Sequence, residues 1–177
     1  MAGDIPVEQA ETLRTIAEVA TAFAGFSGVV VVLGRRAQRE WSYEETMTIT
    51  GLLAFSLGVV FFSFAPLLVQ AAGVPVWRIS NGLFGVYHLG ILVWSTNISF
   101  RRSHDLLIPV RLIVAAEAVG LVIIAFNFAV AAGFFQPLSL FAYLVALVWL
   151  LLMAVLTFSA LLFESRRGVA EPATATR

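Results

Sequence analysis

Two ionisable residues lie deep inside long apolar stretches of the sequence, and their types suit proton or ion chemistry. His88 and Glu117 each lie about eleven residues from the start of such a stretch, or about 16 Å deep if both stretches are membrane-crossing helices. These two stretches are consecutive and would run in opposite directions, so the side chains would lie at a similar depth, where they could meet. An ionisable residue at that depth normally faces the protein interior and has a partner. A pair of this kind either shares one proton or forms a charge-neutral couple.

Three more polar residues, Asn81, Asn127 and Glu18, extend this candidate site. Asn81 and Ser95 share a polar stripe with His88 at helical spacing, and Asn127 shares a broad face with Glu117. Glu18 lies about two turns inside the first apolar stretch and can face either the lipid headgroups or the helix bundle. The residues predicted to handle ions or protons are Glu18, His88, Glu117, Asn81 and Asn127.

The candidate pair has two other interpretations. His88 and Glu117 can serve only to fix the register of neighbouring helices, as buried polar pairs in membrane bundles often do. One histidine with two carboxylates can also bind a metal ion. Haem binding through two histidines is not expected, because the other histidine, His104, lies in a predicted cytoplasmic loop. We predict neither a metal site nor a cofactor.

Several classes of activity are disfavoured by missing residues. The chain has no cysteine, and all eleven of its basic residues are arginines. Thiol nucleophiles, thiolate metal sites and lysine Schiff bases are therefore excluded. There is no glycine-rich phosphate loop, nucleophile elbow or HEXXH zinc motif either. These absences argue against an enzyme, and the formal net charge of zero gives no reason to expect a nucleic-acid partner.

The elements that position these residues are long apolar segments. The 177 residues are 60% hydrophobic and only 12% charged, whereas soluble domains carry roughly a quarter charged residues. We predict an all-α, polytopic membrane helix bundle formed by residues 1–165 as a single domain, followed by a flexible cytoplasmic tail, 166–177. Five transmembrane helices are expected, at about 15–34, 46–72, 76–99, 106–132 and 138–163.

The distribution of arginines predicts the orientation. With five crossings, one side of the membrane carries Arg35, Arg36, Arg39, Arg101, Arg102, Arg111, Arg166, Arg167 and Arg177, and the other carries only Arg14 and Arg78. Arginine-rich loops remain in the cytoplasm. The N-terminus is therefore predicted outside and the C-terminus inside. A four-crossing chain, with the third segment lying in the interface, would put the arginine-rich segments on conflicting sides.

The first segment, 15–34, is rich in small residues. Such residues let helix backbones approach closely, which is how membrane helices associate. This segment is therefore expected at the centre of the bundle, beside the third and fourth segments, although a narrow face of this kind can also line a pore. The fifth segment has no ionisable residue before Glu164 and is expected to face lipid or another subunit. The predicted packing residues of the first segment are Ala17, Thr21, Ala24, Gly25 and Gly28.

The run IAEVATAFAGFSGVVVVLGRR, followed by a tryptophan and acidic residues, resembles the opening of small multi-pass membrane proteins from bacterial genomes. The resemblance covers only this first segment. It implies a bacterial inner (plasma) membrane location and brings no activity with it.

Two functions follow as hypotheses. The first is a non-enzymatic membrane protein that works by helix association, as an accessory subunit or a homo-oligomer, with membrane lipids and another membrane protein or a second copy as partners. The second is a small channel or proton-coupled transporter that uses Glu18, His88 and Glu117.

Overall fold

The computed structural model describes residues 5–36, 43–101 and 110–169. These residues form five α-helices and one short 3₁₀ helix, so the predicted all-α class is confirmed. The elements in chain order are α1 (Val7–Arg36), α2 (Tyr43–Ala71), α3 (Val76–Arg101), α4 (Val110–Ala131), η1 (Gln136–Leu138) and α5 (Ser139–Val169).

Several helix ends differ from the predicted ones. α1 begins directly after Pro6, whose carbonyl accepts hydrogen bonds from the backbone N–H groups of Gln9 and Ala10. Glu8 and Glu11, which precede the predicted first span, therefore belong to the same 30-residue helix. At the other end of the chain, α5 continues past the predicted end of the last span to Val169. The predicted start of the fourth span at 106 and most of the predicted tail, 170–177, lie outside the described residues.

Tight turns join α2 to α3 and α4 to η1. Gly73 follows α2 with a φ of 71°, and Gly133 follows α4 with a φ of 106°. Glycine accepts this left-handed backbone at little steric cost, which lets the chain reverse just past a helix end. Both turns lie at one end of the bundle, where Arg78 Nε of α3 donates a 2.7 Å hydrogen bond to the carbonyl oxygen of Ala131 at the end of α4.

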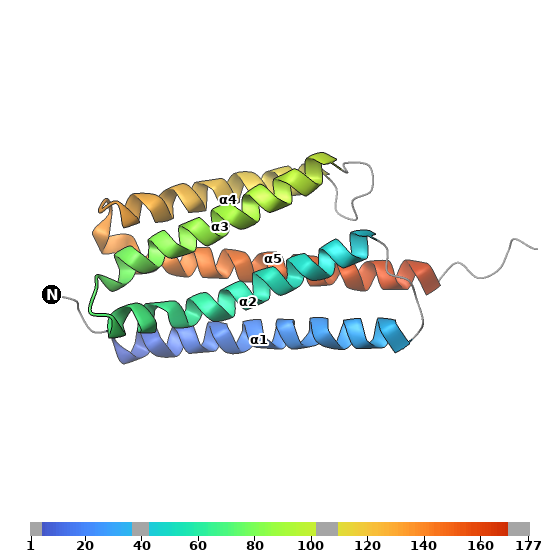
Figure 1. Ribbon diagram of the computed structural model, residues 1–177, viewed down its shortest axis with the longest axis horizontal. Helices are drawn as coiled ribbons and strands as arrows, with labels where there is room; N and C mark the ends of the chain where they lie inside the picture. Colours follow the sequence, from blue (N-terminus) through green and yellow to red (C-terminus); the bar gives the residue numbers. More distant parts are fainter. Residues whose placement is uncertain (1–4, 37–42, 102–109, 170–177) are drawn as a thin grey trace, which may run out of the picture.

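The helices are arranged around α5, which packs against each of the other four helices (Figure 1). α2 packs closely on α5, and α3 packs closely on α4. The fully buried core residues come mainly from α2, α3 and α5; they include Val59, Phe84, Tyr143, Ala146, Leu147 and Leu150.

The predicted central position of the first span is wrong. α1 lies at the edge of the bundle, packed against α2 and more lightly against α5, and not between α3 and α4 (Figure 1). Its buried side consists of apolar residues such as Leu13, Ala17 and Ala20, whereas Arg14 and Glu18 on another side are exposed. A helix with charged side chains on one face cannot be surrounded by apolar neighbours without a large desolvation cost.

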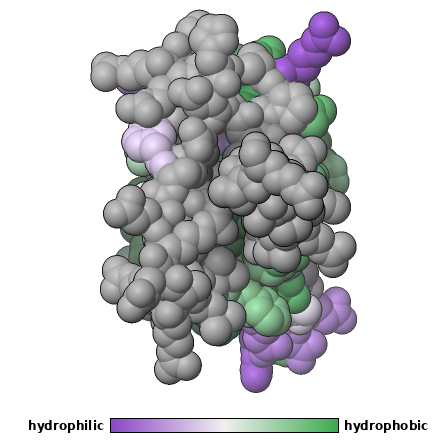
Figure 2. Space-filling view, turned by 90° about the vertical axis from the view of Figure 1, so that its right-hand side faces the viewer, coloured by the Kyte–Doolittle hydropathy of each residue, from purple (hydrophilic) through white to green (hydrophobic). Residues whose placement is uncertain are grey.

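The outer surface of the described helices is strongly apolar. Large exposed apolar side chains occur on every α-helix, for example Phe26, Phe61, Val86, Val122 and Phe141. Figure 2, an end-on view, shows such apolar side chains on the flank of the bundle. Among the described residues, three helical segments are long and apolar enough to cross a membrane: Thr46–Ala71, Arg111–Ala131 and Gln136–Leu162. The structure is therefore compatible with a membrane protein, because soluble monomers rarely expose large continuous apolar patches.

Candidate functional site

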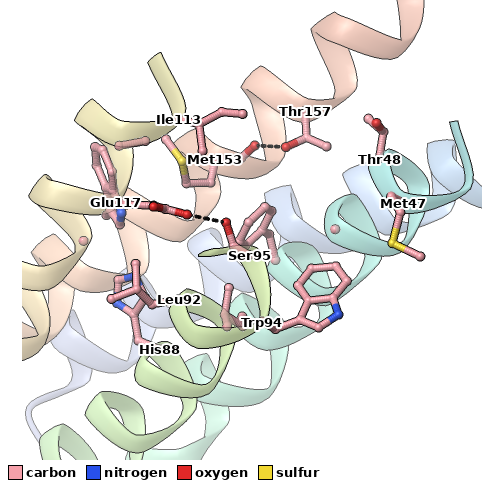
Figure 3. A pocket seen from close by; sticks show the side chains of 16 residues that line it. Met47, Thr48, His88, Leu92, Trp94, Ser95, Ile113, Glu117, Met153 and Thr157 are labelled. Carbon is pink, nitrogen blue, oxygen red and sulfur yellow. Dashed lines mark hydrogen bonds between the residues drawn. The ribbon is translucent and has the colours of Figure 1, made fainter. Parts of the chain in front are cut away.

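A cavity of about 200 Å³ lies between α2, α3, α4 and α5 and is partly open to the surface of the bundle. Its walls are largely apolar and aromatic, with a few polar groups (Figure 3). The lining includes Met47, Thr48 and Phe55 from α2, His88, Trp94 and Ser95 from α3, Glu117 and Gly120 from α4, and Trp149, Met153 and Thr157 from α5.

Glu117 is the acidic group of this cavity. Its Oε1 accepts a 3.0 Å hydrogen bond from the hydroxyl of Ser95 (Figure 3). Ser95 follows His88 by seven residues, or about two helical turns, so the two side chains share one face of α3. That spacing explains why a serine and a histidine of α3 both line a cavity opposite the carboxylate of α4.

His88 is 4% exposed and lines the same cavity. A Cβ atom at Gly120 would lie 3.5 Å from His88 Nε2, an ordinary van der Waals distance, so the imidazole lies directly beside α4 at this residue. Nδ1 of His88 is buried and has no hydrogen-bond partner among the described residues.

His88 and Glu117 are thus brought to one cavity, as expected from their depth. Within the described part of the chain, however, no hydrogen bond or ion pair joins them. The residue bonded to Glu117 is Ser95, which belongs to the predicted polar stripe of His88 but was not predicted as a site residue. Its position on that stripe was the sequence signal for this contact.

The two asparagines of the predicted site have structural partners elsewhere. Asn81 Nδ2 donates to the carbonyl oxygens of Trp77, at 2.6 Å, and Ser139, at 3.1 Å, and so ties α3 to the start of α5. Asn127 Nδ2 donates to the carbonyl oxygen of Ile123 at 2.8 Å. Both side chains are fully buried, and neither lines the cavity.

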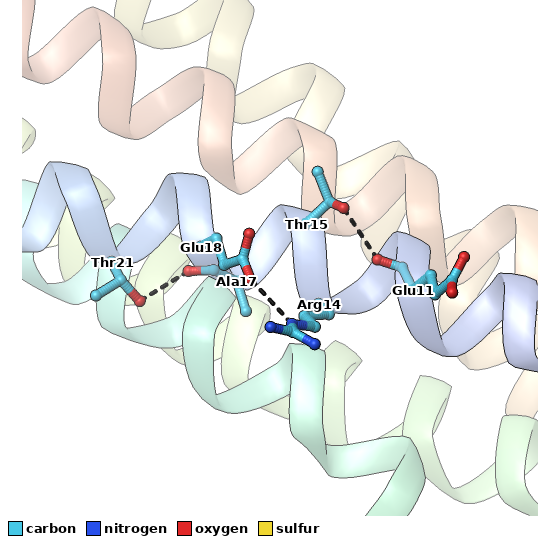
Figure 4. A network of polar contacts seen from close by, with 6 residues as sticks. All are labelled: Glu11, Arg14, Thr15, Ala17, Glu18 and Thr21. Carbon is cyan, nitrogen blue, oxygen red and sulfur yellow. Dashed lines mark hydrogen bonds and ion pairs between the residues drawn. The ribbon is translucent and has the colours of Figure 1, made fainter.

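Glu18 also lies away from the cavity. Its carboxylate forms a 2.9 Å ion pair with Arg14 Nε on the outer side of α1, where the two side chains are 64% and 78% exposed (Figure 4). Glu18 therefore faces outward and not into the helix bundle. A site that combines Glu18, His88 and Glu117 is not formed.

The small residues of α1 are divided between two environments. Ala17 is buried and Ala24 is half-buried, whereas Thr21, Gly25 and Gly28 are exposed. The Thr21 hydroxyl donates to the carbonyl oxygen of Ala17 at 2.8 Å (Figure 4). A Cβ atom at Gly25 or Gly28 would meet nothing within 4 Å. Part of the predicted packing face therefore points away from the rest of the chain.

The contribution of α5 to the cavity was missed. Trp149, Met153 and Thr157 line it, although the fifth span was expected to face lipid or another subunit. The buried alanines at 142 and 146, four residues apart, were a signal for a packed face that sequence reasoning did not use.

The cavity contains two titratable side chains in apolar surroundings. In the portion of the chain that the structure describes, no three histidine or acidic residues gather in a way that suits a metal ion. The arrangement can accept a proton at Glu117 or His88, or it can pair the Glu117 carboxylate with a cation. Comparisons with protein-family models, with curated proteins and with solved structures found no match for this chain.

Proposed function

We propose that this chain is an integral membrane protein that crosses a bacterial inner membrane five times and associates with a second copy of itself through the exposed face of α1. The N-terminus lies outside and the C-terminus in the cytoplasm. The apolar outer surface of the helices and the one-sided distribution of arginines support this topology.

We infer the association from the empty space beside Gly25 and Gly28. Glycine has a low helix propensity, and close packing of a neighbouring helix against it can offset that cost in a membrane. Among the described residues, no atom lies near enough to use it, and both glycines are exposed. A helix from a second copy would fit against this face.

The same face of α1 also carries Arg14, Glu18 and Thr21, at steps of four and three residues that continue to the two glycines. Arg14 and Glu18 already form an ion pair, so this end of the face carries no net charge that would repel a second copy. The part of this face around Thr21, Gly25 and Gly28 is thus formed by small residues, and its charged end is neutral overall.

Cysteine cross-linking tests this association, because the natural chain contains no cysteine. Gly25→Cys or Gly28→Cys in native membranes is expected to form disulfide-linked dimers, since a disulfide requires Cα atoms within about 7 Å. Gly90→Cys is the matched control, because Gly90 is also an exposed helical glycine with nothing within 4 Å of its Cβ position. Failure of both α1 variants to cross-link, or equal cross-linking at Gly90, would contradict the proposal. A cross-link to a protein of different mass would instead indicate an accessory subunit.

A second candidate function is proton-coupled transport or a small channel. The observation that favours it is that His88 and Glu117 line one cavity, whereas Glu18 does not line it. Purified protein in liposomes is then expected to show a pH-dependent flux that is lost in Glu117→Gln. Absence of any proton or ion flux would remove this candidate.

A further inference from the structure

We propose that the cavity between α2, α3, α4 and α5 is a binding site for a small protonated amine with an apolar body. The inference concerns the interior of a single chain, so it does not depend on association through α1. It also holds whether or not the protein transports protons.

The charge of the residues that line the cavity favours a cation over an anion as the ligand. Glu117 is the acidic residue of the lining, and no arginine of the described residues lines the cavity; the chain has no lysine. An anion would therefore meet the carboxylate with no positive group to offset it. Ser95 supplies a single hydrogen bond to Glu117, whereas a carboxylate has about four acceptor positions. The carboxylate thus keeps capacity for the N–H groups of a bound cation.

Because His88 and Glu117 are not bonded to each other, a cation that carries N–H groups can bond to both. Both side chains line the cavity, yet they do not bond to each other. The Nε2 atom of His88 lies beside Gly120 of the same lining, and a neutral imidazole keeps one ring nitrogen as a hydrogen-bond acceptor. A protonated amine between the two residues can donate one N–H to Glu117 and another to His88.

The apolar walls of the cavity favour a ligand whose body is apolar. Trp94, Trp149 and Phe55 supply aromatic faces and edges, and Met47 and Met153 supply polarisable thioethers. Aromatic faces attract cations within about 6 Å. An apolar cavity of about 150 Å³ in another protein accommodates benzene. A space of about 200 Å³ is therefore suited to a body of about one ring with a short arm that carries the amine.

The test is calorimetric binding of 2-phenylethylamine to the purified full-length protein in nanodiscs at neutral pH. The comparison ligands are 2-phenylethanol, which is neutral, and 3-phenylpropionate, which is an anion of similar size. The amine is expected to bind roughly tenfold or more tightly than the alcohol, and the anion is expected not to bind. Equal binding of the amine and the alcohol would overturn the proposal without the need for any variant.

Variants then locate the site. Glu117→Gln keeps the shape and can still accept from Ser95, and it is expected to reduce amine affinity roughly tenfold or more. Glu18→Gln removes an exposed carboxylate on α1 and is expected to leave affinity unchanged. Unchanged affinity in a folded Glu117→Gln protein would overturn the assignment of Glu117.

Phenethyltrimethylammonium, which has no N–H, is expected to bind several-fold more weakly than the amine. Equal affinity would overturn the assignment of His88 as the second contact.

Discussion

The hydroxyl of Tyr143 donates a 2.6 Å hydrogen bond to the carbonyl oxygen of Phe62. Pro66 follows Phe62 by four residues in α2 and has no N–H, so that carbonyl lacks its usual helical donor. Tyr143 and Pro66 are both fully buried, and the bond joins α5 to α2 where the helical hydrogen-bond pattern is interrupted. A proline inside an apolar helix is tolerated here because the neighbouring helix replaces the missing donor.

Tyr143→Phe is expected to lower the free energy of unfolding by about 1 kcal/mol, because it leaves the Phe62 carbonyl unsatisfied. In a Pro66→Ala background the same change is expected to cost less, since the alanine N–H can donate to that carbonyl. Denaturant unfolding of the four proteins measures both costs. Equal costs in the two backgrounds would show that the tyrosine does not compensate for the proline.

Gly58→Ala is expected to destabilise the bundle. A Cβ atom at Gly58 would lie 2.6 Å from ring atoms Cε1 and Cζ of Tyr87, whose hydroxyl donates a 2.6 Å hydrogen bond to the carbonyl oxygen of Ala54. Overpacking of this kind costs roughly 1–3 kcal/mol, which should exceed the gain of about 1 kcal/mol in helix propensity. Gly90→Ala has open space and should be neutral or stabilising in the same thermal-unfolding assay. Similar melting temperatures for the two variants would contradict this packing.

Arg78→Met is expected to lower the free energy of unfolding by about 1 kcal/mol, since the Arg78 side chain donates to the carbonyl oxygen of Ala131 in the last turn of α4. Arg111→Met is the control, because it removes an exposed cation of α4 that is not involved in this bond. Denaturant unfolding of both variants distinguishes a specific cap from a general loss of charge. Equal effects would assign no capping role to Arg78.

The proposed topology predicts which single cysteines react with a membrane-impermeant thiol reagent. Cysteines at Gly73 and Gly133 should react in intact cells, because both turns lie on the predicted outer side. Cysteines at Ser103 and Ala173 should react only after the membrane is permeabilised. Reaction of the cysteines at positions 73 and 133 from opposite sides would mean that only one of α3 and α4 crosses the membrane.

The approximate positions of the five described α-helices could be predicted from the sequence, because helices and turns depend on local signals; the predicted start of α1 and end of α5 were wrong. Gly73 and Gly133 mark two of the chain reversals, and the apolar segments around them are long enough to indicate helices. His88 and Glu117, which were predicted to lie at similar depths, both line one cavity.

The arrangement of the helices could not be predicted in the same way. In a membrane bundle, lipid-facing and buried residues are both apolar, so the pattern around Tyr143 and Trp149 did not show that α5 is central. For the same reason the small residues of α1 did not show which side they face. The partner of Glu117 depends on the relative rotation of α3 and α4, and at this rotation Ser95, and not His88, reaches the carboxylate.

The mass of the protein in nanodiscs or mild detergent, measured by native mass spectrometry, tests association through α1 most directly. The natural chain and the Gly90→Leu control are expected at twice the mass of one chain, and the double variant Gly25→Leu/Gly28→Leu at the mass of one chain. The leucines should not disturb the fold, because both positions have open space around them. A monomeric natural chain, or a double variant that remains dimeric, would contradict association through this face.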